Sequence, residues 1–122
     1  MSVIRRKKGS FHDLEFLVDL RDYGKVDADI QEITFLIKEN PTDADDSLFR
    51  KRLTQAEISK TADADGTQIS VSVSWADTEY SQFTLDKEYM AGLYIQFTGD
   101  AVHDENVDEE FTVIIEQDFI NA

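Results

Sequence analysis

Apolar residues recur at every second position in several short segments of this chain, and this period most constrains its fold. Between Thr67 and Trp75 the apolar residues are Ile69, Val71, Val73 and Trp75, with serines between them. Such alternation is typical of a β-strand with one buried face and one face in water. The same alternation is present in four other segments, at residues 14–20, 30–38, 89–98 and 111–117.

Residues 33–51 predict a hairpin-like element. An alternating strand is followed by an acidic turn that opens with the only proline, Pro41. Proline lacks an amide donor and favours extended geometry at the residue before it, so we expect the ladder to loosen there. Residues 48–58 fit neither period cleanly, and we expect one strand or two short edge strands. Residues 63–66 predict a tight turn with Gly66 at positive φ.

Several short strands separated by turn signals predict an all-β fold, an antiparallel β-sandwich of about seven strands. The length of 122 residues suits one domain. We divide the chain into a basic N-terminal arm, residues 1–11, and a single β-sandwich domain, residues 12–122. The shared period predicts a core of Leu14, Phe16, Val18, Phe35, Ile37, Val71, Val73, Trp75, Ile95, Phe97, Val113 and Ile115.

The charge is divided unequally along the chain. Residues 1–60 carry a net charge of −1, whereas residues 61–122 carry −13. An acidic surface repels nucleic acid and anionic lipid, so we expect neither as a partner. There is no apolar run of about 18 residues, and no apolar region follows the basic patch as it would in a secretory signal. The chain has no cysteine, which excludes disulfides and thiolate metal sites.

Two groups of acidic residues are candidate cation sites. The sequence Asp63-x-Asp65-Gly66 resembles the opening of a calcium loop, but the twelfth position is Ser74 instead of glutamate, which favours a simple turn. A second group is formed by Asp43, Asp45 and Asp46, and such acids in a loop usually sit in water. We therefore expect no metal and no cofactor.

The sequence contains no recognisable catalytic set. His12 and His103 are isolated, whereas zinc sites need several ligands at fixed spacing. There is no nucleophile elbow, phosphate-binding loop or dinucleotide fingerprint. Paired carboxylates are too abundant for any one pair to be informative. We therefore expect no enzyme activity, and a hydrolytic enzyme has no positive support.

Aromatic residues offer an alternative function, a carbohydrate-binding or adhesin-type module. A sugar-stacking platform would draw on Trp75, Tyr80, Phe83, Tyr89 and Tyr94. Trp75, however, shares the apolar face of its strand, which places it in the core. Tyr89 is also a candidate tyrosine corner, hydrogen-bonded to the backbone at a strand crossover. Tyr23 and Tyr94 are better candidates for exposed contact residues.

Eight short motifs occur in one order along the chain. They are Arg5-Arg6-Lys7-Lys8-Gly9-Ser10-Phe11, Asp22-Tyr23-Gly24, Val26-Asp27, the acidic turn at 43–48, the Gly-led strand at 66–73, Ala76-Asp77-Thr78, the Leu85 to Tyr89 spacing and Gln117-Asp118. In this order they resemble the immunoglobulin-like domain typified by the N-terminal domain of the baseplate upper protein of phages of Gram-positive bacteria. The chain departs from that pattern at Glu88, where the family usually has glycine, and in its longer, more acidic final hairpin.

The resemblance implies an immunoglobulin-like sandwich that acts as a virion structural protein, made in the host cytoplasm. In that family the domain attaches fibres or receptor-binding proteins to a larger symmetric assembly and has no catalytic residues. We therefore expect other virion proteins of the tail, baseplate, neck or capsid as partners, and a homo-oligomer. The residues expected to bind a partner are Arg5, Arg6, Lys7, Lys8, Tyr23 and Tyr94. An N-terminal arm is poorly ordered unless it is tied down, and its charge suits an acidic surface.

Overall fold

The computed structural model describes residues 3–7, 13–40, 42–44, 47–74, 83–99, 105–106 and 111–116. These residues form nine strands and three short 3-10 turns, with no α-helix among them. The strands are β1 (Val3–Lys7), β2 (Leu14–Asp19), β3 (Ile30–Lys38), β4 (Phe49–Arg52), β5 (Ile58–Ala62), β6 (Gln68–Val73), β7 (Glu88–Phe97), β8 (Glu105–Asn106) and β9 (Phe111–Glu116). The 3-10 turns are η1 (Leu20–Tyr23), η2 (Asp27–Asp29) and η3 (Leu53–Gln55). Within this part of the chain, no helix is long and apolar enough to cross a membrane.

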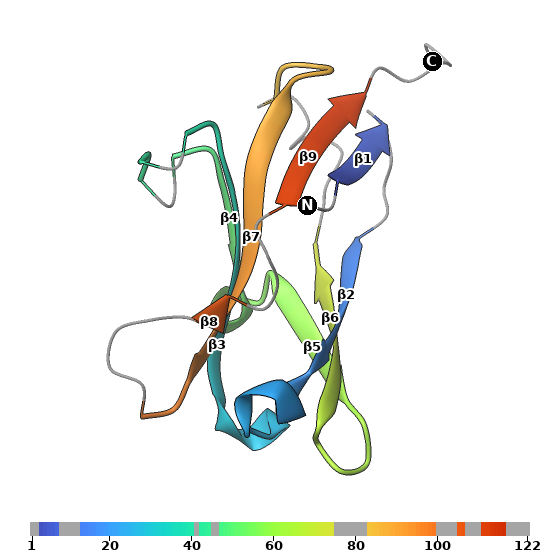
Figure 1. Cartoon of the computed structure of the whole chain (residues 1–122), viewed down its shortest axis with the longest axis vertical. Helices are drawn as coiled ribbons and strands as arrows, with labels where there is room; N and C mark the ends of the chain where they lie inside the picture. The colour runs from blue at the N-terminus through green and yellow to red at the C-terminus, as the bar shows by residue number, and fades with distance from the viewer. Residues whose placement is uncertain are drawn as a thin grey trace.

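The strands form two sheets, which Figure 1 shows as separate layers. The larger sheet has the order β1-β9-β7-β3-β4, with β8 beside β7, and the smaller sheet has the order β2-β6-β5. All pairs are antiparallel except β1 with β9, which are parallel. Immunoglobulin domains place strands G, F, C and C′ in one sheet and B, E and D in the other. The order here is the same, and the predicted fold class is confirmed.

The core lies between the two sheets and follows the predicted period of two. Fully enclosed side chains come from both sheets, among them Phe35 and Ile95 from the larger sheet and Val71 from the smaller one. The ring of Phe35 lies 5.9 Å from that of Phe16 in the smaller sheet and 6.0 Å from that of Phe49 in β4. The predicted core residues are all buried, except that Phe16 is half-buried and Trp75 lies outside the described residues.

The predicted hairpin at residues 33–51 is confirmed, since β3 and β4 pair antiparallel with Ile37 opposite Phe49. For residues 48–58, the alternative of two edge strands is the one that the structure shows. β4 ends the larger sheet, η3 follows, and β5 begins at the edge of the smaller sheet. The carboxylate of Glu32 accepts hydrogen bonds from the backbone amide and the hydroxyl of Thr54, which fixes η3 against β3.

Part of the predicted basic arm belongs to a sheet. Val3–Lys7 form β1, which pairs with β9 from Thr112 to Glu116 at one edge of the larger sheet. The boundary predicted after residue 11 therefore differs from the structure over these five residues. For residues 8–12, which lie outside the described residues, the division stays a prediction.

One charged side chain points toward the core from an edge strand. Lys51 is opposite Phe35 in the register and is only 9% exposed. Its Nζ lies 5.3 Å from the centroid of the Phe49 ring and 3.9 Å from Oε2 of Glu57. Ammonium groups are attracted to the faces of aromatic rings, and Glu57 supplies a nearby negative charge. β4 thus carries an inward lysine between two outward arginines.

Tyr89 forms the tyrosine corner predicted for it. It lies at the start of β7, is buried, and its Oη accepts a hydrogen bond of 2.7 Å from the backbone amide of Thr84. Its ring also meets that of Phe83 at 5.1 Å in an edge-on arrangement. In antibody domains this tyrosine stands two residues before the second cysteine, a position held here by Ala91. The corner fixes where the chain enters β7.

We expect Phe35→Ala to destabilise the fold by about 3–5 kcal/mol, because it removes a large side chain with no exposed area. The matched control is Val26→Ala, at an apolar position that is 41% exposed, where surface substitutions usually change stability by only about 0.5 kcal/mol. Urea unfolding followed by circular dichroism measures both variants. Equal midpoints for the two would show that the sheets do not pack through Phe35.

We expect Tyr89→Phe to lower the unfolding free energy by about 1–3 kcal/mol, because it leaves the Thr84 amide without this acceptor. The substitution keeps the ring, so packing against Phe83 is retained. Amide hydrogen exchange reports the lost bond directly, through faster exchange at Thr84. Wild-type protection of that amide in the variant would contradict the corner.

Candidate functional site

Three of the four basic residues predicted to bind a partner lie in β1. The register places Arg5, Arg6 and Lys7 opposite Ile114, Ile115 and Glu116 of β9. Lys8 lies outside the described residues. The structure therefore brings three of these residues to an edge strand of the larger sheet. Their role in partner binding stays a prediction.

Both tyrosines predicted as exposed contact residues are half-buried. The ring of Tyr23, at the end of η1, lies 5.8 Å from that of Phe97 and packs against the core. Tyr94 points outward from β7, and its ring folds over Gly92. A Cβ at Gly92 would lie 2.6–2.8 Å from the outer atoms of the Tyr94 side chain, so a larger residue there would require that side chain to shift. Both tyrosines are thus only partly exposed, and their role in partner binding stays a prediction.

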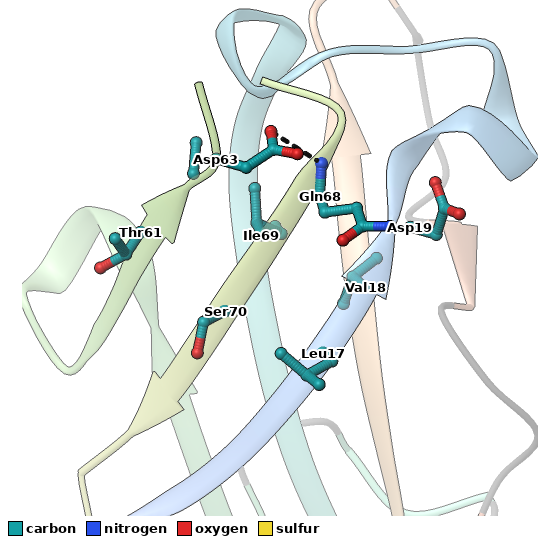
Figure 2. Close-up of a pocket in the computed structure, with 9 residues that line it drawn as sticks. Leu17, Val18, Asp19, Thr61, Asp63, Gln68, Ile69 and Ser70 are labelled. Carbon is teal, nitrogen blue, oxygen red and sulfur yellow. Dashed lines mark hydrogen bonds between the residues drawn. The ribbon is translucent and has the colours of Figure 1, made fainter. Parts of the chain in front are cut away.

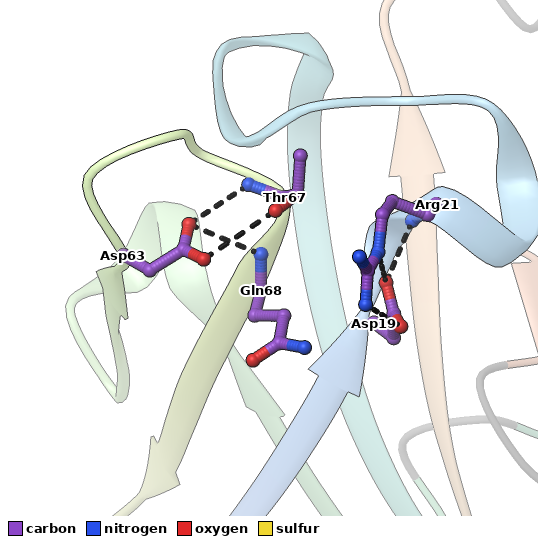
Figure 3. Close-up of polar contacts among 5 residues, drawn as sticks. All are labelled: Asp19, Arg21, Asp63, Thr67 and Gln68. Atoms are coloured by element: carbon purple, nitrogen blue, oxygen red, sulfur yellow. Dashed lines mark hydrogen bonds and ion pairs between the residues drawn. The ribbon is translucent and has the colours of Figure 1, made fainter.

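The candidate calcium loop at Asp63 is a structural turn. As Figure 3 shows, the Asp63 carboxylate accepts hydrogen bonds from the backbone amides of Thr67 at 2.9 Å and Gln68 at 3.3 Å. Gly66 has φ +70°, as predicted for this turn. The hydrogen bond from the Gln68 amide is the largest of the effects that lower the pKa of Asp63 below its usual value of 3.8, and the bonds from Thr67 add to it. The carboxylate therefore stabilises the turn between β5 and β6.

Other acids also have local partners. Arg21 holds Asp19 through two side-chain hydrogen bonds of 2.9 and 2.8 Å (Figure 3), which lower the pKa of the carboxyl. In the second candidate cation group, Asp43 accepts from the backbone amide of Asn40 at 3.0 Å, while Asp45 and Asp46 lie outside the described residues. No group of three or more metal-ligating side chains occurs among the residues that the structure describes.

A depression of about 410 Å³ lies on the outer face of the smaller sheet. Figure 2 shows residues from its three strands along it. Leu17, Ser70 and Thr61 form one row across the sheet, because Leu17 pairs with Ser70 and Ser70 with Thr61. The central residue is the smallest of the three, so the middle of the row is hollow. We call this depression, lined by Leu17, Thr61, Gln68 and Ser70, the serine trough.

Leu17 is the most unusual residue of the serine trough. Its side chain is 89% exposed although it is apolar. Beside it on β2, the exposed Glu15 stands opposite Ser72 and has no ion pair or hydrogen bond among the described residues. Asp13 accepts a long hydrogen bond of 3.4 Å from the Ser72 hydroxyl. The face is therefore acidic around an exposed leucine.

The outer face of the larger sheet is basic at its β4 edge. Phe49 and Lys51 are buried, so alternation turns Arg50 and Arg52 outward. They stand opposite Leu36 and Thr34 of β3. In the described part of the chain neither guanidinium has an ion pair, and the buried Nε of Arg52 has no hydrogen-bond partner. This outward pair, Arg50 and Arg52, is called the arginine pair below.

Our interpretation of the sequence missed both faces. A signal for Leu17 was present, since an apolar residue between Phe16 and Val18 breaks the alternation of β2. For the arginine pair the signal was the alternation in Phe49-Arg50-Lys51-Arg52. It is hard to recognise in the sequence because the second inward residue is a lysine and not an apolar residue. A local sequence pattern does not show which cations have carboxylate partners. The ion pairs of Lys60 with Asp27 and of Lys87 with Glu39, for example, join distant segments.

We expect the charge of Asp63 to make stability depend on pH in the acid range. Its pKa is lower in the folded chain than the unfolded value of 3.8, so its contribution is complete above that value and is lost as the pH falls through the folded pKa. Asp63→Asn keeps the acceptor oxygen but lacks the charge. The unfolding free energies of wild type and variant should therefore converge as the pH is lowered from 7 toward about 2.

Chemical unfolding at a series of pH values measures this difference. Ser59→Ala, a neutral change at an exposed position of β5, is the control and should follow the wild-type curve at every pH. A constant gap between wild type and Asp63→Asn down to the lowest pH would contradict the proposed contribution.

Comparison with known proteins assigns no family to the chain. No protein-family model matches it, and no curated protein matches it significantly.

Proposed function

We propose that this chain is a structural protein of a phage virion, a non-catalytic module that docks other virion proteins in the tail, baseplate, neck or capsid. The proposal begins from the ordered motifs that resemble the baseplate domain family. It is supported by the immunoglobulin-like strand order of the two sheets. One fold can serve many functions, so the function of this chain depends on the surfaces that its fold presents.

The observation that carries the proposal is the pair of outer sheet faces. One face presents an exposed leucine beside Glu15, which has no partner among the described residues, and the other presents the arginine pair. Other charged side chains form ion pairs within the chain, as Asp19 does with Arg21 and Asp27 with Lys60. Arg50 and Arg52 are half-buried, so they offer a partner only part of their side chains. Charged and apolar groups that reach solvent are what a docking surface requires.

The alternative, a carbohydrate-binding or adhesin-type module, needs an exposed row of aromatic rings. Of the aromatic residues proposed for that platform, Phe83 and Tyr89 are buried and Tyr94 is half-buried over Gly92. Trp75 and Tyr80 lie outside the described residues. The described part of the chain thus favours docking of a protein over stacking of a sugar.

The test is the protein content of purified particles. Phage particles from a host whose prophage or infecting phage encodes this chain are banded by density and analysed by quantitative mass spectrometry. We expect the chain at a fixed copy number relative to the major capsid protein, with a stoichiometry that survives further purification. A virion protein of known copy number is the internal control. Absence from intact particles, with the chain abundant in the lysate, would overturn the proposal.

A further inference from the structure

Most cations whose side chains the structure describes already have a partner. Among the described residues, Arg21 is held by Asp19, Lys60 by Asp27 at 2.5 Å, and Lys87 by Glu39. Two further lysines form cation–π contacts, Lys25 with the ring of Phe97 and Lys51 with that of Phe49. Lys38 also has an interaction partner. Among the cations whose side chains the structure describes, a set that excludes those of β1, the arginine pair is the exception, and in a protein of net charge −14 we expect it to meet an acceptor.

Glu15 is the complementary group, but it cannot pair with the arginines of its own chain. It points outward from the smaller sheet, whereas the arginine pair points outward from the larger one. Packed sheets lie about 10 Å apart, and the two sets of side chains extend from them in opposite directions. A contact between them therefore requires a second molecule.

Charge also decides how two molecules can meet. Two smaller sheets face to face would oppose Glu15 and Asp13 of one copy to the same acids of the other, and two larger sheets would oppose arginine pairs. Like charges placed opposite one another are unfavourable. The contact that remains joins the smaller sheet of one copy to the larger sheet of the next.

The serine trough suits arginine side chains in both shape and chemistry. Its volume is about 410 Å³, and residues of all three strands line it (Figure 2). An arginine buries its aliphatic stem on apolar surface and keeps its planar donor group free. Leu17 offers apolar surface, while the Glu15 carboxylate beside the trough and the Ser70 hydroxyl within it can accept hydrogen bonds.

We propose that the serine trough, with Leu17 and Glu15, binds the arginine pair Arg50 and Arg52 of a second copy of this chain. The contact is head-to-tail, because the two surfaces are different, so each copy keeps one surface of each kind open. Contacts of this type close into a ring or continue as a filament, depending on the rotation between copies. The proposal deepens the proposed function by naming one partner in the assembly.

Affinity and specificity come from different parts of this contact. Exposed ion pairs contribute little and are screened by salt, so burial of Leu17 supplies the larger share of the affinity. The charges set which face meets which. We therefore expect Leu17→Ser to weaken association roughly tenfold or more at any salt concentration. Reversal of either charge should weaken it by at least about tenfold at low salt.

The experiment is sedimentation velocity of the full chain over a range of concentrations, at about 0.05 M and about 0.5 M salt. Wild type should associate at low salt, with an average mass that rises past that of a dimer. Glu15→Arg alone and Arg50→Glu/Arg52→Glu together should each remain monomeric. Mixing the two variants should restore association, because each then offers the surface that the other lacks. One chain carrying all three substitutions should associate by itself.

Two controls separate the contact from general effects of charge and folding. Asp22→Arg, at an exposed position in η1, changes the net charge as Glu15→Arg does and should leave association intact. Arg50→Lys/Arg52→Lys keeps the charge but lacks the planar donors, so it should associate more weakly than wild type and more strongly than the double glutamate variant. Thermal melts verify that every variant is folded.

Specific results would overturn the proposal. A wild type that stays monomeric at every concentration and salt, a mass that stops at the dimer, or reversed variants that fail to recover on mixing would each do so. The measurement uses the isolated chain without particles. If the isolated chain does not self-associate, the mass spectrometry of purified particles still tests the proposed function. If the chain is absent from particles, the sedimentation result still tests the self-association.

Discussion

Phe35 lies at the centre of the layer between the two sheets, with no exposed area and with aromatic neighbours on both sides. Every other feature of the molecule depends on this layer, because each strand must turn alternate residues toward it. That requirement fixes the register of β2 against β6 and of β3 against β7, since a shift by one residue would expose the whole apolar set. The outward residues, including both proposed docking surfaces, are placed by the same registers.

Much of the fold follows from the sequence for this reason. The alternation of Ile69, Val71 and Val73 requires one buried face whatever the rest of the chain does, and Gly66 and Tyr89 mark the two bends next to strands. What the period cannot give is the partner of an edge strand. Residues 3–7 pair with β9 more than a hundred residues later, and the period of so short a basic segment carries no information about that pairing.

The candidate site was less predictable than the fold. Tyr23 and Tyr94 were expected in solvent because they do not belong to the inward set, but an outward position on a sheet is not the same as exposure. Tyr94 covers Gly92, and Tyr23 leans on Phe97. Leu17 is 89% exposed, and its neighbours across the sheet are a serine and a threonine, too small to cover it.

Lys51 has a consequence for how molecules of this shape behave when crowded. β4 ends the larger sheet, so one side of its backbone is open to a strand from another molecule. A strand that extended the sheet there would also have to extend the apolar layer, and it would meet an ammonium group where a hydrophobic neighbour is needed. Continuous cross-strand growth at this edge is therefore penalised. High local concentration then favours contacts between preformed faces, which are reversible, over merging of sheets into fibrous aggregates.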